Sequence, residues 1–505
     1  MRDARHILDQ LRGQGATPCG ISADSRRIGP GDIFAAMPGM RSDGRAYIKN
    51  ALAQGAAGVV WESAGAGNLA EQFDQVPNVP VANLQALSGE LAHLIYDRPS
   101  EKLWLCGITG TNGKTSVSQW IAQSFELLGR RCGVIGTLGS GLPGALRESA
   151  NTTPDAISVH ATLAELLTAG AQACAMEVSS IGLDQGRVNA AHFDTVVFTN
   201  LTRDHLEYHG SMEAYGAAKA RLFALPGIKT AVINLDDEFG LRLCADLAGK
   251  GVRRIGYSLA GDSYKAALAD EVLTAQDLSV GGAGLRFCVL TAHGDAAIAA
   301  PLLGRFNAAN LLAVLGALLG AGIPLQQAVA SFARLTPPPG RLQIVASVDA
   351  ATVVEPLLVV DYAHTPDALE QALTTLREVA TARGGRLLCV FGCGGERDPG
   401  KRPLMGRVAE RLADALVITS DNPRSEEPLA IIGAIRAGMN MNMDAPVEVD
   451  RVQAIRQTVK TMSGRDVLLI AGKGHEPYQE IAGRRLPYSD LEQAHIALTA
   501  WRASA

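Results

Sequence analysis

The sequence predicts an α/β protein of three domains, and three observations support this. The chain has 505 residues, enough for about three or four domains of ~100 to 200 residues each. Short apolar runs alternate with helix-length segments, as in sheets that are covered by helices. Three successive prolines at 337–339 interrupt this alternation, because proline stiffens the backbone and donates no amide hydrogen bond.

Composition narrows the possible environments and partners. Hydrophobic residues make up 47% of the chain and charged residues 19%, which is the balance of a globular protein. A net charge of -5 gives no broad basic field, so we expect no nucleic-acid partner. Eight cysteines without a Cys-x-x-Cys pair favour free thiols in the cytoplasm. The charged start and the lack of an apolar run of ~20 residues predict neither a signal peptide nor a membrane span.

The first domain is expected at residues 1–88. Strand-like runs at 32–37, 58–61 and 76–81 alternate with a helical stretch at 46–54, which predicts a small α/β unit. A helix from about 87 to 96 then leads to the second domain.

The second domain, 89–337, is expected to be P-loop ATPase-like. The apolar run at 103–108 is bounded by a glycine-rich turn, as a buried parallel strand would be. Further apolar runs at 173–178, 195–199 and 230–234 predict a mainly parallel sheet with helices on its faces. The long apolar stretch at 311–325, which three glycines and Pro324 interrupt, predicts a buried helix.

The third domain is expected at 338–505, after the proline-rich break. Strand-like runs at 357–361, 387–392, 415–419 and 466–472 are separated by helix-length segments. This spacing predicts a doubly wound, Rossmann-like fold.

A variant phosphate-binding loop follows the first strand of the second domain. Gly107-Ile-Thr-Gly-Thr-Asn-Gly-Lys-Thr115 lies between that strand and an amphipathic helical stretch. The strict pattern would place glycine at 108, where this chain has Ile108. Glycines let backbone amides face phosphate oxygens, Lys114 supplies a charge for the β and γ phosphates, and Thr115 can hold Mg²⁺.

Three further side chains are candidates for the metal and the chemistry. Glu177 ends a predicted strand, and His205 and Lys219 lie in segments that follow later strands. Phosphoryl transfer needs such groups to neutralise developing charge. Taken singly, each is more often a helix cap or a surface side chain.

Together these segments resemble the Mur ligase family, ATP-dependent enzymes that add amino acids to the peptidoglycan stem peptide in cell-wall synthesis. The resemblance runs through all three domains, and its motifs occur in the family's order. They are Gly110-Thr-Asn-Gly-Lys-Thr115, Glu177-Val-Ser-Ser180, Asn200-Leu-Thr-Arg-Asp-His-Leu-Glu-Tyr-His209, Ala218-Lys-Ala-Arg-Leu-Phe223, Gly304-Arg-Phe-Asn-Ala-Ala-Asn310, Gly340-Arg341 and Asp361-Tyr-Ala-His-Thr-Pro366.

Within the family, the chain is similar to the members that add meso-diaminopimelate as the third residue. The markers are Asn151-Thr-Thr-Pro-Asp155, Asp421-Asn-Pro-Arg-Ser-Glu-Glu-Pro428 and Gly472-Lys-Gly-His-Glu476. The resemblance implies that ATP activates the D-glutamyl γ-carboxylate of UDP-N-acetylmuramoyl-L-alanyl-D-glutamate as an acyl phosphate, which the amine then attacks. It implies a cytoplasmic enzyme with small-molecule substrates, and we expect a monomer.

The resemblance also implies roles for single residues. Lys114, Glu177, His205 and Lys219 would be catalytic, and Thr115, Glu177, His205 and Lys219 would hold two Mg²⁺ ions. Lys219 would carry a carbamate derived from CO₂. The ATP contacts would be Gly110, Thr111, Asn112, Gly113, Lys114, Thr115, Asn307, Arg341 and Asp361. Because the last two lie beyond the proline-rich break, we expect the third domain to close onto the loop.

The first domain would bind the uridine end around Asp24-Ser25-Arg26 and Gly39-Met-Arg-Ser-Asp-Gly44, where Met40 departs from the polar side chain of some relatives. The nucleotide-linked dipeptide would contact Ser25, Asn151, Thr152, Thr153, Ser179, Gln185 and Arg187. Without the resemblance, the Thr-Thr-Pro-Asp stretch would be interpreted as a turn and helix start.

Diaminopimelate would contact Arg397, Asp421, Asn422, Pro423, Arg424, Gly472 and Glu476. Lysine lacks the distal carboxylate of diaminopimelate, and Arg424 could form a bidentate pair with that group.

Several alternatives remain at this level. A lysine-adding ligase of the same family is the nearest, followed by a folylpolyglutamate or cyanophycin-type ligase. A nucleotide-dependent binding or switch ATPase is a rival from another class.

Overall fold

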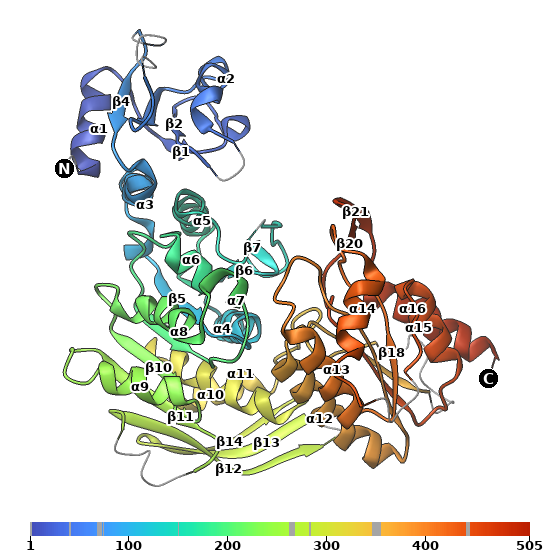
Figure 1. The fold of residues 1–505 in the computed structure, drawn as a ribbon. Helices are drawn as coiled ribbons and strands as arrows, with labels where there is room; N and C mark the ends of the chain where they lie inside the picture. Colours follow the sequence, from blue (N-terminus) through green and yellow to red (C-terminus); the bar gives the residue numbers. More distant parts are fainter. Residues whose placement is uncertain are drawn as a thin grey trace.

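The computed structural model describes residues 3–39, 42–67, 73, 75–149, 151–261, 268–281, 284–345, 355–440 and 445–504. Three main sheets follow one another along the chain, each accompanied by helices (Figure 1). Met40 lies outside the described residues, so its predicted effect on the uridine contact stays a prediction.

The first sheet has four parallel strands in the order β1-β2-β3-β4. The strands are β1 (Gly20–Ser22), β2 (Asp32–Ala36), β3 (Gly58–Glu62) and β4 (Asn78–Val81), and the helices are α1 (Ala4–Gly13), α2 (Ile48–Ala53) and the 3-10 turns η1 (Ser25–Arg27) and η2 (Gly44–Tyr47). Three predicted strands are confirmed. The sequence interpretation missed α1, which the Asp3 side chain caps by accepting a hydrogen bond from the amide of His6 at 2.8 Å.

Helix α3 (Leu84–Ile95) and the 3-10 turn η4 (Pro99–Glu101) connect the first sheet to the second. The helix predicted at 87–96 is confirmed and begins three residues earlier. Helix α3 runs without a break across residue 88, where the first domain boundary was predicted. This boundary and the one predicted at 337 stay predictions.

The second sheet has ten strands in the order β14-β13-β12-β11-β10-β9-β5-β8-β6-β7. They are β5 (Trp104–Thr109), β6 (Cys132–Gly136), β7 (Gly139–Gly141), β8 (Ala173–Glu177), β9 (Thr195–Phe198), β10 (Thr230–Asn234), β11 (Arg253–Ser258), β12 (Glu271–Gly281), β13 (Gly284–Thr291) and β14 (Gly294–Ala300). The predicted mainly parallel sheet is confirmed. Only β12–β13, β13–β14 and β6–β7 pair antiparallel within the described sheet.

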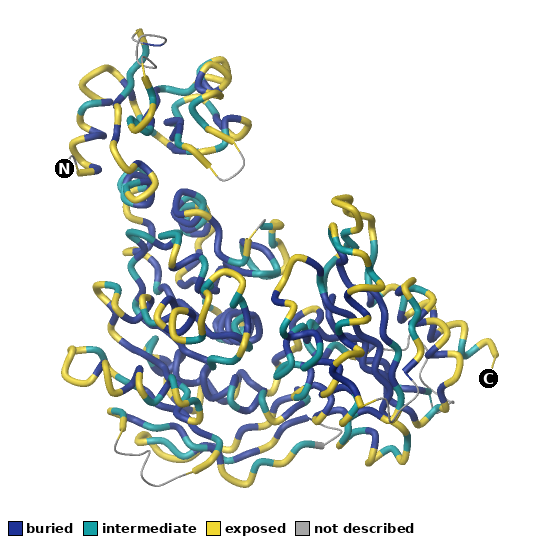
Figure 2. The backbone as a smooth tube through the Cα atoms, viewed as in Figure 1, coloured by how far each residue is buried: buried dark blue, intermediate teal, exposed yellow. Residues whose placement is uncertain are grey.

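Helices cover both faces of this sheet. They are α4 (Lys114–Leu127), α5 (Ala156–Thr168), α6 (Ser180–Asp184), α7 (Leu206–His209), α8 (Met212–Ala220), η5 (Arg221–Ala224), α9 (Glu238–Asp246), α10 (Arg305–Gly320) and α11 (Leu325–Phe332). The buried helix predicted at 311–325 is confirmed in part: it is α10, which ends at Gly320, while Leu325 begins α11. Residues 310–319 of α10 are all buried between the sheet and α4 (Figure 2).

The third sheet has the order β15-β16-β19-β17-β18, with parallel pairing except between β15 and β16. Its strands are β15 (Gln343–Ile344), β16 (Leu357–Asp361), β17 (Leu387–Phe391), β18 (Ala415–Ile418) and β19 (Val467–Ala471). One core joins it to α12 (Pro366–Arg383), α13 (Lys401–Leu412) and α14 (Pro428–Arg436), and a second core joins it to α15 (Arg451–Lys460) and α16 (Asp490–Ser504). The predicted doubly wound fold is confirmed, and the hairpin β20 (Tyr478–Ile481) and β21 (Arg484–Pro487) was not predicted.

The proline-rich segment lies against α4. The indole Nε1 of Trp120 donates to the carbonyl of Thr336 at 2.9 Å, and the amide of Thr336 donates to Gln123 Oε1 at 2.9 Å. In the described part of the chain, every helix is too short or too polar to cross a membrane.

Candidate active site

The phosphate loop, residues 110–113, joins β5 to the start of α4. Gly113 has φ +86°, and a Cβ there would lie 2.6 Å from Asn310 Oδ1. Glycine is therefore required both by the backbone conformation and by the close approach of α10. Lys114 Nζ donates to the carbonyls of Gly110 and Thr111, both at 2.8 Å, and burial lowers the pKa of Lys114.

Glu177 joins three segments at the end of β8. Its carboxylate is buried and accepts hydrogen bonds from Thr115 Oγ1 at 3.0 Å, Thr137 Oγ1 at 3.0 Å and the Thr137 amide at 2.9 Å. The structure thus brings together two of the predicted metal ligands, Thr115 and Glu177. Hydroxyl and carboxylate oxygens at this spacing fit the oxygen preference of Mg²⁺.

Lys219 lies beneath the phosphate loop. It is 1% exposed, its Nζ donates to the Gly110 carbonyl at 2.8 Å, and it lies 4.2 Å from the ring centre of Tyr215. Burial, together with the charge of Lys114, holds the pKa of Lys219 well below its usual value. An uncharged amine is the nucleophilic form of lysine.

His205 is the N-cap residue of α7 with φ +54°, and its ring makes a T-shaped contact with that of Tyr215, with the ring centres 6.2 Å apart. Its Nε2 lies 3.5 Å from Asp204 Oδ2, and its Nδ1 lies 3.7 Å from Glu207 Oε1. Within the described residues, no hydrogen bond or ion pair joins His205 to Glu177 or Lys219.

The residues predicted to bind the nucleotide-linked dipeptide form one network beside Glu177. Thr153 Oγ1 lies 3.0 Å from both the Glu177 carbonyl and Ser179 Oγ, and it accepts from the Ser179 amide at 2.9 Å. Arg187 donates to the Thr153 carbonyl at 2.8 Å and to Gln185 Oε1 at 2.9 and 2.6 Å. The Thr152 hydroxyl lies 3.1 Å from that of Thr137.

Two predicted members lie apart from this network. Asn151 is exposed, and its carbonyl accepts from Ser149 Oγ at 2.8 Å. Ser25 is buried in the first sheet's unit, at the start of η1.

Arg341 reaches the phosphate loop from beyond the proline-rich segment. Its Nη2 donates to Thr115 Oγ1 at 3.1 Å, and its guanidinium lies 4.8 Å from the ring centre of Tyr362. Asp361 accepts from the Leu342 amide at 2.6 Å, and burial raises the pKa of Asp361. Asn307 contacts Asn310, the residue that lies close to Gly113 of the phosphate loop. Asn310 Nδ2 donates to Asn307 Oδ1 at 2.9 Å.

Sequence reasoning missed a set of contacts that bring the third sheet's unit onto the second. The Asp204 carboxylate lies 3.7 Å from His364 Nε2 and 3.9 Å from Lys401 Nζ. Burial would raise the pKa of Asp204, but the neighbouring imidazoles and Lys401 outweigh it and hold that pKa well below its usual value. Beside it, Arg203 pairs with Asp398 at 3.0 Å.

The residues predicted to bind diaminopimelate gather at the ends of β17, β18 and β19. Asn422 Nδ2 donates to Glu476 Oε2 at 2.8 Å. Lys473, which was not predicted, is fully buried and donates to both Asn422 Oδ1 at 2.9 Å and Glu476 Oε2 at 2.8 Å. Gly472 has φ +116°, and a Cβ there would lie 2.4 Å from Asp421 Oδ2.

The two predicted arginines both lie close to Gly394. A Cβ on Gly394 would lie 3.0 Å from Arg424 Nη1 and 3.7 Å from Arg397 Cγ. Arg424 donates to the Gly395 carbonyl at 2.5 Å, and its Nε lies 3.7 Å from Glu480 Oε2. Pro423 begins a turn that contains Arg424, because its carbonyl accepts from the Glu426 amide at 3.0 Å.

The fold and this site define an α/β enzyme of three units. Its second unit binds a nucleotide at the phosphate loop, and the other two units flank that unit along the chain. Three family descriptions match the chain: "Mur ligase family, catalytic domain" over residues 19–96, "Mur ligase middle domain" over 108–318, and "Mur ligase, glutamate ligase domain" over 340–474. The chain therefore belongs to the Mur ligase family.

Similar proteins include the UDP-N-acetylmuramoyl-L-alanyl-D-glutamate–2,6-diaminopimelate ligases of Pseudomonas aeruginosa and Chromobacterium violaceum. Both are 52% identical to this chain over 95% of it, and the match covers 95% and 94% of their own lengths. A solved structure of such a ligase has 36% identity and a TM-score of 0.65, covering 96% of this chain and 95% of that one. MurF from Acinetobacter baumannii has 18% identity and a TM-score of 0.65, covering 92% and 95%, and this likeness shows the fold alone.

Proposed function

We propose that this chain is an ATP-dependent ligase that joins 2,6-diaminopimelate to the D-glutamyl γ-carboxylate of UDP-N-acetylmuramoyl-L-alanyl-D-glutamate. One observation carries the proposal. Relatives that bear the name of this activity are 52% identical over 95% of the chain, so all three units are shared. The product would be a peptidoglycan precursor.

Each unit has a proposed task. Residues 1–88 would bind the uridine end, 89–337 would bind ATP, and 338–505 would bind the amino acid. The contact between Arg341 and Thr115 supports this division, because it places the third unit against the phosphate loop. The eight free cysteines support work in a reducing cytoplasm, and we infer that the enzyme acts as a monomer.

The chemistry must bring two anions together. A carboxylate and a triphosphate ~4 Å apart would repel by several kcal/mol in a partly dry site. Lys114 and Arg341 lie where they could offset this repulsion. Mg²⁺, which the family uses, would add further positive charge. Thr115 and Glu177 would hold one ion. The proposed ligands of the two ions also include His205 and Lys219.

Lys219 is proposed to carry a carbamate. Its low pKa favours the free amine, whose lone pair can attack CO₂; the new N–C bond forms as the nitrogen releases a proton. The product is an anion in place of an uncharged amine. Mass spectrometry of intact protein kept in bicarbonate should find one added CO₂ that Lys219→Arg lacks, and equal masses would contradict the modification.

The amino-acid pocket favours diaminopimelate over lysine. Arg424 would pair with the distal carboxylate and Arg397 with the near one, while Asp421, Asn422, Gly472 and Glu476 would contact the distal ammonium and carboxylate. Lysine would leave Arg424 without a substrate carboxylate to pair with, and such a mismatch can discriminate by ~10⁴.

An ADP-release assay tests the proposal. With the uridine-linked dipeptide present, we expect ADP release to depend on meso-diaminopimelate and to be at least ~10³-fold less efficient with lysine. Equal efficiency would indicate the lysine-adding alternative. Release without any amino acid would indicate the switch ATPase.

A further inference from the structure

Two imidazoles and a carboxylate converge outside the active site, where α3 leads into the second sheet. His93 belongs to α3, Glu101 ends η4, and His192 lies in the loop before β9. Glu101 Oε1 lies 3.2 Å from His93 Nε2 and 3.6 Å from His192 Nε2. One donor atom of each residue lies within 4.8 Å of the other two.

These separations match the edges of a tetrahedral zinc site. Zinc binds imidazole nitrogen and carboxylate oxygen at ~2.0 to 2.2 Å, so neighbouring ligands of a tetrahedral ion lie about 3.3 to 3.6 Å apart. The two separations that involve Glu101 Oε1 are already close to these values. Because the His192 side chain is 44% exposed, it can turn to adjust the third edge.

The backbone holds the three donors together by contacts that need no ion. The amide of Arg98 donates to the His93 carbonyl at 2.7 Å, and the amide of His192 donates to Ser100 Oγ at 3.1 Å. The rings of His93 and His192 are stacked, with centres 5.3 Å apart and planes 23° apart. These segments are therefore already ordered in the folded chain. Binding an ion would need no further ordering of the backbone, and this favours binding.

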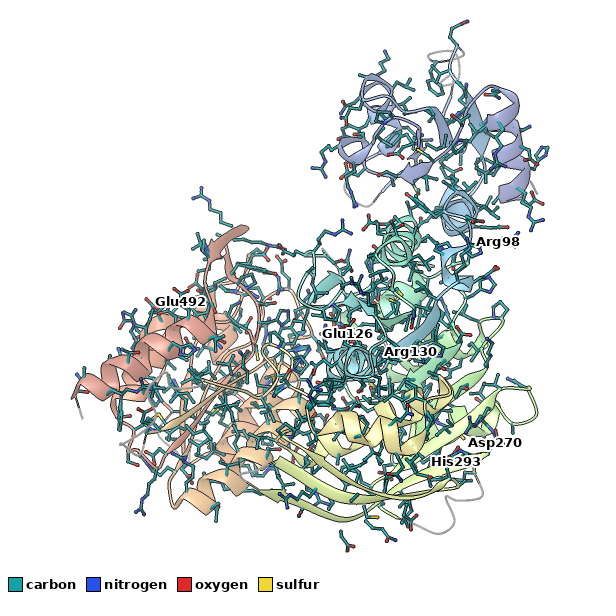
Figure 3. All side chains as sticks on the ribbon, turned by 180° about the vertical axis from the view of Figure 1, so that it is seen from behind. Arg98, Glu126, Arg130, Asp270, His293 and Glu492 are labelled. Atoms are coloured by element: carbon teal, nitrogen blue, oxygen red, sulfur yellow. The ribbon has the colours of Figure 1, made fainter. Side chains whose placement is uncertain are left out.

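The Glu101 carboxylate divides its two oxygens between different neighbours. Arg98, which Figure 3 labels near the junction of the first unit with the second, lies 3.9 Å from Oε2. Oε1 faces both imidazoles. His93 is buried at the base of the cluster, whereas Glu101 is 40% exposed, so an ion could enter from solvent and keep a water ligand.

We propose that His93, Glu101 and His192 form a zinc-binding site. Two imidazole nitrogens and one carboxylate oxygen suit Zn²⁺, whereas Mg²⁺ and Ca²⁺ prefer sites made mostly of oxygen ligands. The bound ion would link α3 and η4 to the loop that enters β9. It would thereby stabilise the attachment of the first unit to the second, apart from the phosphoryl-transfer site.

The simpler explanation is a hydrogen-bonded pair of histidine and glutamate. The chain offers a matched example in His293 and Glu271, whose Nε2 and Oε2 lie 3.5 Å apart. In the described residues, this pair belongs to no such three-residue group. His293→Ala is therefore a matched control for the loss of one imidazole beside a carboxylate.

Titration of the full-length protein with Co²⁺, a spectroscopic substitute for Zn²⁺, tests the proposal. Excess Mg²⁺ keeps the proposed magnesium ligands occupied, and thiolate charge-transfer bands would report binding to cysteine. We expect one equivalent with the visible bands of tetrahedral nitrogen and oxygen ligands, displaced by Zn²⁺. Affinity should fall at least ~10-fold in His192→Ala and in Glu101→Gln but stay unchanged in His293→Ala.

The same titration can overturn the proposal. Equal Co²⁺ affinity in all four proteins, or absorption by thiolate ligands alone, would mean that the cluster binds no metal. Circular dichroism of the metal-free variants checks folding, and Glu101→Gln, which preserves the side-chain size, supports the result if His192→Ala is unstable.

Discussion

At the scale of single residues, buried charges determine how the amino-acid pocket is held. Lys473 is fully buried, and its ammonium contacts both Asn422 and Glu476. It also faces the rings of Tyr478 and Tyr488, at 5.6 and 5.9 Å from their centres. A lysine in this position fixes two side chains that are proposed to contact substrate.

Lys473→Met should therefore weaken the use of diaminopimelate. The change leaves Glu476, whose side chain is 17% exposed, without its cation, so the cost should be smaller than the ~3 to 5 kcal/mol of a fully buried pair. We expect KM for diaminopimelate to rise at least ~10-fold, which corresponds to ~1.4 kcal/mol, while KM for ATP stays nearly constant. Lys460→Met, at an exposed position on α15, is the control. A parallel rise in both KM values would show a general loss of structure instead.

Arg424→Ala separates amino-acid recognition from nucleotide binding. Removing the guanidinium takes away the group that would pair with the distal carboxylate, so kcat/KM for diaminopimelate should fall ~10² to 10⁴-fold. ATP affinity, measured by calorimetry, should be nearly unchanged. A variant that uses diaminopimelate as well as the parent would exclude this role for Arg424.

His475 makes stability depend on pH. Burial, together with the charges of Arg341 and Lys473, lowers the pKa of His475 to about 4. The unfolded chain therefore binds a proton more readily than the folded one, so the contribution is complete above about pH 6.5 and is lost as the pH falls toward 4. The free energy of unfolding should fall by at most ~3 kcal/mol over this range through His475. Denaturant titrations at both pH values should give His475→Gln a smaller decrease, and an equal decrease would contradict the assignment.

At the scale of elements, local patterns were predictable and long-range partners were not. The phosphate loop follows from a strand, glycines and a helix that are adjacent in sequence. The strands β12, β13 and β14 were missed because they pair antiparallel and bury only one face; β14 alternates exposed and buried residues toward its end. Asp204 lay within a predicted motif, but its partners His364 and Lys401 become neighbours only in the folded chain.

Gly113→Ala tests the phosphate loop as an element. A Cβ would strain the backbone at φ +86° and lie 2.6 Å from Asn310 Oδ1, so ATP affinity should fall at least ~10-fold. Gly129→Ala, after the end of α4, has φ +74° and nothing within 4 Å of the added Cβ. It should cost about 1 kcal/mol of stability but leave ATP binding unchanged. Equal ATP affinity in both variants would contradict the proposed loop function.

At the scale of the whole molecule, the second and third units meet through ion pairs and hydrogen bonds. Arg203 pairs with Asp398, and Asn112 donates to Asp367 Oδ2 at 2.9 Å. The hydrogen bond from Arg341 to Thr115 is a further contact between the same two units. The family resemblance indicated that the units cooperate, but the pairs that join them depend on the fold.

Asp398→Asn should weaken this closed arrangement. The Arg203 side chain would lose its anionic partner, and we expect a larger radius of gyration by X-ray scattering in the presence of an ATP analogue and the dipeptide substrate. Arg221→Gln, which removes an exposed pairing with Asp184 inside the second unit, is the control. Scattering curves that match the parent protein would show that the pair does not hold the units together.

Product analysis by mass spectrometry, with ¹⁸O in the D-glutamyl γ-carboxylate, tests the account most directly. Purified enzyme with Mg²⁺, ATP and meso-diaminopimelate should lengthen the uridine-linked dipeptide by one diaminopimelyl residue. One ¹⁸O atom should appear in the released phosphate for each amide bond formed. Phosphate without ¹⁸O, or ATP consumption with no lengthened product, would contradict the account.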